Sequence, residues 1–317
     1  MMIRFGYVAM ALNILQGSPN KTMTVAGLSK ISEQQDRLTR LRRIVRENLT
    51  TQMRVLRYNA AHDIHVFRFT SKLIPLATHP SVSGWNYREE FQTELAEIGE
   101  FVREHGMRVS SHPDHFTVLN SPEPKVVEAA KGDLAYHAGI FDAMGLGAEA
   151  KLVIHVGGVY QNKELALERF KESFSGLSPE MQNRLMLEND DKSYSAADVL
   201  GLCRQLGRPM VLDVHHHSCY NTGETLEEML PEIFATWRDM MPKIHVSSSK
   251  SAGSFRSHAD YIHAEEFVAF LHKAKPFGAD FDVMIEAKQK DKAMFQLLAD
   301  LRQVPGVKFI DQATIEY

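Results

Sequence analysis

The chain has 317 residues, of which 44% are hydrophobic and 24% are charged. These are ordinary globular values, so they exclude a fully disordered, collagenous or fibrous chain and allow a large core. The 36 lysines and arginines and 40 acidic residues give a formal net charge of −4, which excludes a general basic field that would hold nucleic acid or an anionic membrane. Any polyanion must therefore be bound locally.

The two cysteines, Cys203 and Cys219, cannot form a disulfide framework, and neither belongs to a CxxC pair. This usage fits a reducing compartment. Residues 1–8 lack the apolar stretch and cleavage site of a secretory signal, and no apolar run approaches the roughly 20 residues that span a bilayer. We therefore expect a cytoplasmic protein with no membrane partner.

Eight short apolar runs, each bounded by polar residues or glycine, predict eight strands. Segments with helical spacing of apolar residues lie between them, such as the one with Phe91, Leu95 and Ile98. This alternation requires parallel strands with crossover helices, and eight repeats favour a closed barrel over an open doubly wound sheet. We expect an α/β fold, a single (β/α)8 TIM barrel, as one domain over residues 1–317. The predicted strands are Ile3–Val8, Val66–Thr70, Arg108–Ser111, Leu152–Val156, Leu185–Leu187, Met210–Val214, Lys243–Val246 and Asp282–Ile285.

The arginine-rich stretch Gln34–Tyr58 predicts the first outer helix. We interpret its charge as a solvated face rather than a DNA contact, because barrel helices lie away from the loops where ligands bind. The tail after Lys288 has amphipathic helical spacing at Phe295, Leu297 and Leu298. It is expected to complete the outer ring.

Histidines and acidic residues follow six of the predicted strands, and strand ends in a closed barrel converge on one pocket. A single histidine at a strand end is more often a hydrogen-bonded structural residue than a ligand. Six strand ends with this pattern are not explained as separate structural residues, because burying so many ionisable groups without a metal would cost several kcal/mol per uncompensated charge. Mixed imidazole and carboxylate ligands suit zinc, manganese or iron. The residues are His112, His155, Glu188, Asp213 with His215, His216 and His217, then His245 and Glu286, and His258 in the loop after the seventh strand.

This set exceeds the roughly four to six ligands that one ion uses, so we expect two or three ions bridged by a carboxylate. The adjacent His215, His216 and His217 cannot all point inward. We favour His216, because the Asp-x-x-His spacing recurs in metal-dependent barrels, and we expect the other two to orient their neighbours. The histidines without this context are expected to be surface or packing residues, namely His62, His65, His105, His137, His263 and His272.

These residues resemble those of the UV damage endonucleases, a DNA repair family related in fold and metal site to endonuclease IV and more distantly to xylose isomerase-like barrels. The resemblance runs from Ile3 to Lys288. Its motifs here are Phe5-Gly6-Tyr7, Leu56-Arg57-Tyr58-Asn59, Leu73-Ile74-Pro75-Leu76-Ala77-Thr78-His79-Pro80, Ser111-His112-Pro113, His155-Val156-Gly157-Gly158, Leu187-Glu188-Asn189-Asp190, Asp213-Val214-His215-His216-His217, Pro242-Lys243-Ile244-His245 and Met284-Ile285-Glu286-Ala287-Lys288.

The resemblance implies a cluster of divalent ions, with manganese expected and Zn2+ or Mg2+ as alternatives. It also implies that Lys243 lies beside the cluster, as a carbamate or as a cation, and that His79 lies near the site. We take Glu188 as the bridging ligand, and Glu188, Lys243 and Glu286 as the catalytic residues. The implied ligands are His112, His155, Glu188, Asp213, His216, His245, His258 and Glu286.

The implied reaction is hydrolysis of the phosphodiester immediately 5′ to UV photoproducts, and to other lesions including abasic sites, leaving a 3′-hydroxyl. Two or more ions can lower the pKa of a water, polarise the scissile phosphate and stabilise the leaving 3′-oxygen. The expected partner is damaged double-stranded DNA. One-sided engagement of a duplex needs only a monomer.

Lesion recognition requires distortion of the duplex, because weakened pairing lowers the cost of extruding a base. The resemblance implies probing side chains in the loop after the third strand, here His115 and Phe116, which depart from the Gln-Tyr pair expected of the family. Phe116 can still act as a wedge. Tyr7, at the tip of the first strand, is either an aromatic contact to flipped nucleotides or a core residue.

Two other functions fit these residues less well. A metal-dependent sugar isomerase needs only one or two ions and a small enclosed pocket, so the surplus histidines and the wedge candidates argue against it. A barrel that merely binds damaged DNA would not require so complete a set of ligands. We therefore expect a metal-dependent endonuclease.

Overall fold

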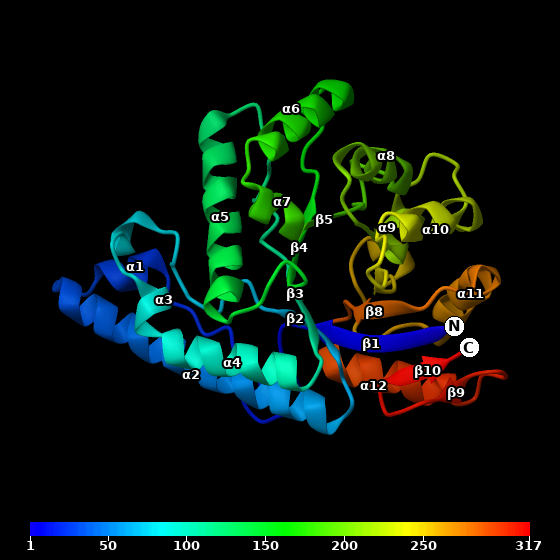
Figure 1. Ribbon diagram of the computed structural model, residues 1–317, viewed down its shortest axis with the longest axis horizontal. Helices are drawn as coiled ribbons and strands as arrows, with labels where there is room; N and C mark the ends of the chain where they lie inside the picture. The colour runs from blue at the N-terminus through cyan, green and yellow to red at the C-terminus, as the bar shows by residue number, and fades with distance from the viewer.

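The computed structural model describes residues 1–317 and contains a closed barrel of eight parallel strands (Figure 1). Neighbouring strands pair in chain order, and β1 closes the barrel because it pairs in parallel with both β8 and β2. All eight predicted strands are confirmed, with ends that differ by at most one residue. The strands are β1 (Met2–Val8), β2 (Val66–Phe69), β3 (Arg108–Ser111), β4 (Lys151–His155), β5 (Leu185–Glu188), β6 (Met210–Asp213), β7 (Lys243–Val246) and β8 (Phe281–Ile285).

An outer ring of helices covers the barrel, and Figure 1 shows the two lower helices of this ring, α2 and α4, side by side. The basic stretch forms the long helix α2, as predicted, and the tail forms α12. The longer helices are α2 (Gln34–Ala61), α4 (Gln92–Glu104), α5 (Pro124–Ala143), α6 (Lys163–Ser175), α8 (Ala196–Leu206), α10 (Leu226–Ala235), α11 (Ala264–Ala274) and α12 (Lys290–Leu301). Shorter pieces are α1 (Val25–Ser29), α3 (Tyr87–Glu90), α7 (Pro179–Arg184), α9 (Val214–Cys219) and the 3-10 turns η1 (Pro80–Val82), η2 (Ala252–Ser254) and η3 (Lys275–Phe277).

A C-terminal hairpin, which the sequence did not predict, is formed by β9 (Lys308–Phe309) and β10 (Thr314–Glu316). The first half of β1 pairs antiparallel with β10, and its second half pairs with β2, which begins opposite Gly6. The hairpin therefore covers the part of the β1 edge that β2 leaves open, and an uncovered edge would invite pairing with another chain.

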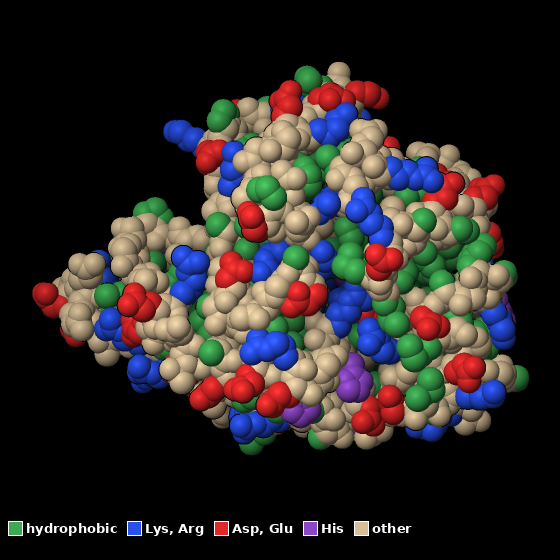
Figure 2. Space-filling view, viewed as in Figure 1, with side chains coloured by type: hydrophobic (Ala, Val, Ile, Leu, Met, Phe, Trp, Pro, Cys, Tyr) green, Lys and Arg blue, Asp and Glu red, His purple; other side chains and the backbone are tan.

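Basic and acidic side chains are interspersed over the face seen in Figure 2, with a group of lysines and arginines near its middle. Several arginines serve the ends of helices. Arg103 donates to the carbonyls of Met144 and Gly145 just after α5, and Arg184 donates to those of Leu146 and Ala150 in the connection from α5 to β4. Helix C-termini carry free carbonyls and partial negative charge, which such cations stabilise. No helix combines the length and apolar character needed to cross a bilayer.

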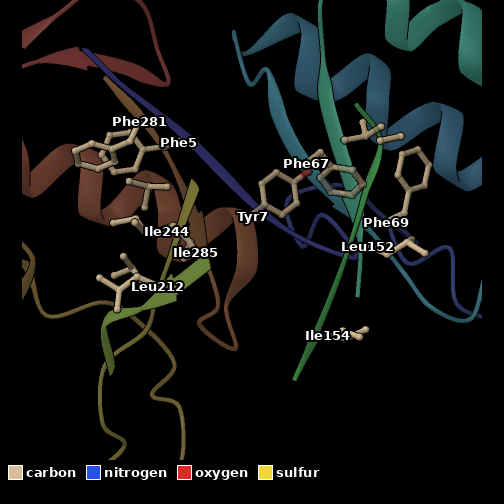
Figure 3. Close-up of a cluster of buried hydrophobic side chains, with 14 of the residues drawn as sticks. Phe5, Tyr7, Phe67, Phe69, Leu152, Ile154, Leu212, Ile244, Phe281 and Ile285 are labelled. Atoms are coloured by element: carbon tan, nitrogen blue, oxygen red, sulfur yellow. The ribbon is translucent and has the colours of Figure 1, made fainter. Parts of the chain in front are cut away.

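Aromatic and aliphatic side chains from the strands form the core, part of which Figure 3 shows. Tyr7 and Phe67 meet edge to face with ring centres 5.2 Å apart, and Phe5 meets Phe267 of α11 in the same way at 5.6 Å. Alternate residues of a strand share a face. His245 therefore projects from the same side of β7 as the buried Lys243, at the end of the strand where the functional side chains gather.

Candidate metal centre

The buried carboxylate of Glu188, the last residue of β5, lies at the centre of a ring of imidazoles. Its Oε2 is 3.2 Å from His112 Nε2 and 3.8 Å from His155 Nε2. Its Oε1 is 2.8 Å from His245 Nδ1 and 3.8 Å from His216 Nδ1. These histidines come from β3, β4, β7 and α9 or the residues next to them, so the closure of the barrel brings together groups that are far apart in sequence.

The side chains form three overlapping groups in which the ligand atoms all lie within 4.8 Å of one another. Glu188 belongs to each of them, and seven of the eight predicted ligands take part. Such an arrangement fits a carboxylate shared between two or three ions. The groups are His112 with His155 and Glu188, Glu188 with Asp213 and His216, and Glu188 with His245 and Glu286.

His258, the eighth predicted ligand, belongs to none of the three groups but borders them. Its ring centre is 5.9 Å from that of His216. Its Nδ1 lies 2.9 Å from the carbonyl oxygen of Glu286 and donates to it. The free Nε2 is thus the nitrogen that could ligate an ion.

Hydrogen bonds fix the ring nitrogen that the other histidines present. His112 Nδ1 donates to the carbonyl oxygen of Pro113 at 2.8 Å. His216 Nδ1 donates to the carbonyl oxygen of Asn189 at 2.9 Å. His155 Nδ1 is 3.3 Å from the carbonyl oxygen of Glu188. Because a carbonyl only accepts, these bonds leave Nε2 unprotonated in the neutral ring and able to bind metal.

Two buried atoms of the site lack a hydrogen-bond partner, Oδ2 of Asp213 and Nε2 of His245. The other oxygen of Asp213 accepts from the backbone N–H of His216 at 2.8 Å. A buried polar atom without a partner is costly, and a divalent cation held by Glu188, Asp213 and His216 would satisfy the unpaired oxygen of Asp213. The mixture of imidazole and carboxylate is also what manganese, zinc and iron prefer. The residues present therefore fit a metal cluster.

Opposite charges balance within the cluster. Burial opposes protonation of His245, but the carboxylates of Glu188 and Glu286 raise its pKa to about 9. Burial likewise opposes charge on His216, while Asp213 and Glu188 raise its pKa to about 9. Burial would raise the pKa of Glu188, yet the neighbouring His245 and His155 hold it well below its usual range. Metal ions would therefore replace bound protons at this site.

Arg68 contacts the cluster directly, whereas the predicted catalytic residue Lys243 makes its contact elsewhere in the barrel interior. Arg68 of β2 forms an ion pair with Glu286, a contact that no motif in the sequence indicated. Lys243 is fully buried, and its Nζ is 3.4 Å from Ser110 Oγ. Burial and the nearby Arg108 lower the pKa of Lys243 to about 7. Lys243 joins none of the three groups of ligand atoms.

Tyr7 is the predicted DNA contact that the structure does not support. Its side chain is fully buried, and its hydroxyl donates to Asn59 Oδ1 at 2.6 Å. Its ring packs against Phe67 (Figure 3). A residue so enclosed cannot reach a nucleotide, so of the two roles left open by the sequence Tyr7 has the core role.

The remaining predicted site residues lie outside the cluster. His115 and Phe116 are exposed on the loop after β3, with ring centres 5.8 Å apart. His79 caps η1 by accepting from the backbone N–H of Ser81. Of the three consecutive histidines only His216 joins the ligand groups, while the buried His215 and His217 do not.

Comparison with known proteins places this chain in a family. The model of the UV-endonuclease UvdE family matches residues 3–317. The chain belongs to this family. A UV DNA damage endonuclease from Bacillus cereus (strain B4264) is 43% identical over 319 residues, and one from Bacillus mycoides (strain KBAB4) is 42% identical; both alignments cover the whole of both chains. The resemblance inferred from the motifs is thus confirmed.

Solved structures agree with the barrel. The crystal structure of SacUVDE has 33% sequence identity and a TM-score of 0.85, covering 95% of this chain and 99% of that chain. Endonuclease IV from Thermus thermophilus has 15% identity and a TM-score of 0.57, covering 94% of this chain and 97% of the other. L-ribulose 3-epimerase has 12% identity and a TM-score of 0.52, covering 83% of this chain and 84% of the other. The last two likenesses concern the fold alone. The predicted TIM barrel is confirmed.

Proposed function

We propose that this chain is a metal-dependent DNA repair endonuclease. It hydrolyses the phosphodiester immediately 5′ to UV photoproducts and to other lesions, including abasic sites, and leaves a 3′-hydroxyl. The observation that carries the proposal is the convergence of six ligand side chains around Glu188 in a chain of the UV-endonuclease family. Family membership also argues against the sugar isomerase. We further propose that residues 1–317 act as one domain and as a monomer. We also propose a cytoplasmic location, which the two free cysteines support because they fit a reducing compartment.

Each group of ligand atoms around Glu188 would hold one ion, with Mn2+ the first candidate. When bound, the ions would lower the pKa of a water and stabilise charge on the scissile phosphate and the leaving 3′-oxygen. The carboxylate of Glu188 bridges the groups. Arg68 orients Glu286 through their ion pair, and the carbonyls that accept from the histidines orient the rings. Lys243 acts beside them from the barrel interior.

Recognition of damage is assigned to the exposed loop after β3. Phe116 has 59% of its surface exposed, so its ring is accessible to a partner on the loop that follows His112. An aromatic ring can stack on bases that have lost a partner. The ring of His115 lies beside that of Phe116. His79 is proposed as a further contact to the duplex, at a greater distance.

The deciding experiment is incubation of manganese-loaded protein with a UV-irradiated duplex of defined sequence, followed by mapping of each nick. We expect a nick directly 5′ to the photoproduct with a free 3′-hydroxyl that a polymerase extends. Protein treated with a chelator is the control and should leave the duplex intact. A nick elsewhere, or equal incision of unirradiated duplex, would contradict the proposal.

A further inference from the structure

Large apolar side chains are exposed mainly at one end of the barrel. Nine such residues stand out, and six of them lie on loops that follow the carboxyl ends of strands β1, β3, β4 and β7. Single exposed apolar residues are normal on a protein surface. Their concentration at the end that carries the metal centre is informative. The six are Leu12, Leu15, Phe116, Tyr160, Phe255 and Tyr261.

Leu15 is the most exposed of these, with 84% of its surface accessible. It lies in the loop between β1 and α1, whose backbone makes a tight turn. The N–H of Ala11 donates to the carbonyl of Gly17, and the N–H of Gly17 donates to that of Ile14, both at 3.0 Å. Gln16 has φ 54°, in the left-handed region. The turn thus presents Leu15 at its tip.

Buried and charged groups hold this loop in place. The carboxylate of Asp291, fully buried in α12, accepts from the N–H groups of Leu12 at 2.6 Å and Asn13 at 3.1 Å. Arg54 of α2 donates to the carbonyl of Leu15 itself at 2.8 Å. Asp291 lies five residues after Glu286 in the chain. The loop is therefore anchored to the start of α12, which follows shortly after Glu286 of the candidate metal centre.

We propose that Leu15 is an apolar wedge that enters the base stack of a damaged duplex on the β1 side of the metal centre. The inference rests on the proposed function, because it takes DNA as the partner. Apolar side chains inserted between base steps partly unstack them and bend the duplex. A lesion has already weakened stacking and pairing, so insertion costs less there than in intact DNA. Because the loop is already ordered, little further ordering opposes binding.

Leu15 and Phe116 would then act from different sides. They follow β1 and β3, two strands that are separated in the barrel by β2. One apolar side chain on each loop can support a distorted duplex at two points, and the ions hold the phosphate near Glu188. The role of Leu15 is one of positioning and lesion selectivity, not of chemistry.

The test uses a duplex with one photoproduct and the fluorescent base 2-aminopurine beside it, mixed rapidly with manganese-loaded protein. Unstacking raises the fluorescence before any incision. We expect Leu15→Ala to reduce this rise and to lower the preference for damaged over intact duplex about tenfold, whereas Leu15→Met keeps both within about twofold. Leu165→Ala is the matched control, because Leu165 is also an exposed leucine, at 54%, but lies on the outer helix α6.

An unchanged fluorescence rise and preference in Leu15→Ala would overturn the proposal, as would an equal loss in Leu165→Ala. Thermal unfolding of the variants should match that of the wild type, since both side chains are exposed. Incision by the wild type tests the proposed function, and the fluorescence rise tests the wedge. Unstacking that depends on Leu15 without incision would support the wedge and contradict the endonuclease.

Discussion

Glu188 contacts four histidines and is shared by all three groups of ligand atoms. Its burial means that its negative charge persists only because protonated histidines or bound cations compensate for it. The charge of Glu188 and the charges of the groups around it therefore depend on each other. A change at Glu188 should affect each ion that the centre holds.

Glu188→Gln is expected to lower incision of UV-irradiated duplex by more than about 100-fold. The amide keeps one acceptor oxygen but replaces the other with an NH2 donor, so it cannot bridge two cations. Metal content by mass spectrometry and incision by gel assay are the measurements. Circular dichroism should show a retained fold. Normal incision by the metal-loaded variant would remove Glu188 from the mechanism.

Phe116→Ala should reduce the ratio of incision between damaged and intact duplex about tenfold, because one base loses its stacking partner. Phe116→Tyr keeps the aromatic ring and serves as the control that retains the ratio. The ratio is obtained from kcat/KM on the two duplexes under identical salt. Equal ratios for the alanine and tyrosine variants would speak against stacking.

His137 makes stability depend on pH. It is buried, with Nδ1 2.9 Å from Ser111 Oγ, and burial together with the charge of His112 lowers its pKa to about 3. In the unfolded chain a histidine has a pKa of about 6.5. Between these values the unfolded state binds the extra proton, so His137 makes the free energy of unfolding fall as the pH falls.

His137→Gln should therefore reduce the slope of the free energy of unfolding against pH, by up to about 1.4 kcal/mol per pH unit between pH 6.5 and pH 3. Urea unfolding of the metal-free wild type and variant at several pH values measures the difference. If the two curves of unfolding free energy against pH run parallel, His137 does not carry this dependence.

At the level of elements, α4 packs so closely against the end of α5 that only glycine fits at one contact. A Cβ at Gly99 would collide with the carbonyl oxygen of Met144, the residue that follows α5. Gly132, in the middle of α5, has no neighbour within 4 Å of the same position. The two glycines thus have different reasons to be present.

Gly99→Ala should lower the free energy of unfolding by about 1–3 kcal/mol through overpacking. Gly132→Ala should raise it by about 0.5–1 kcal/mol, because alanine favours the helix. Chemical denaturation of both variants, with metal removed, gives the comparison. A neutral Gly99→Ala would mean that the two helices can shift apart.

The sequence predicted the eight barrel strands because each is a short, buried apolar run between polar residues. It missed β9 and β10, which have two and three residues and no apolar pattern of their own. Their pairing depends on β1 at the opposite end of the chain, as in the register of Met2 with Glu316. Local patterns cannot report such a contact.

The ligand cluster was predictable for a related reason, since closure of a barrel brings strand ends together whatever their distance in sequence. The role of Tyr7 could not be predicted, because a tyrosine at a strand end can face the core or the solvent. Its bond to Asn59, a residue of α2, decides the matter. The ion pair of Arg68 with Glu286 likewise depends on tertiary packing alone.

For the whole molecule, the net charge of −4 leaves little general attraction for DNA, and acidic and basic side chains are mixed on the one face that Figure 2 shows. Some of the arginines, such as Arg103 and Arg184, already serve backbone carbonyls. If the chain binds DNA as proposed, we expect binding to depend on a few local contacts with phosphates near the candidate metal centre.

Affinity for intact duplex should accordingly be weak and should fall about 100-fold between 50 and 200 mM salt, as for about four phosphate contacts. Fluorescence anisotropy with a labelled duplex measures it, and chelation of the metal should weaken it further. Tight binding that does not respond to salt would show a contact surface that the charge distribution does not reveal.

The hairpin that completes the β1 edge also brings the first and last residues together, since the N–H of Tyr317 donates to the carbonyl of Met1 at 3.0 Å. A short peptide linker could span this gap. The polypeptide is thus suited to circular permutation, with a new opening in an exposed connection such as that around Gly176, between α6 and α7. Fusion partners attached at Met1 or Tyr317 would emerge beside this hairpin, where they could disturb the pairing of β10 with β1.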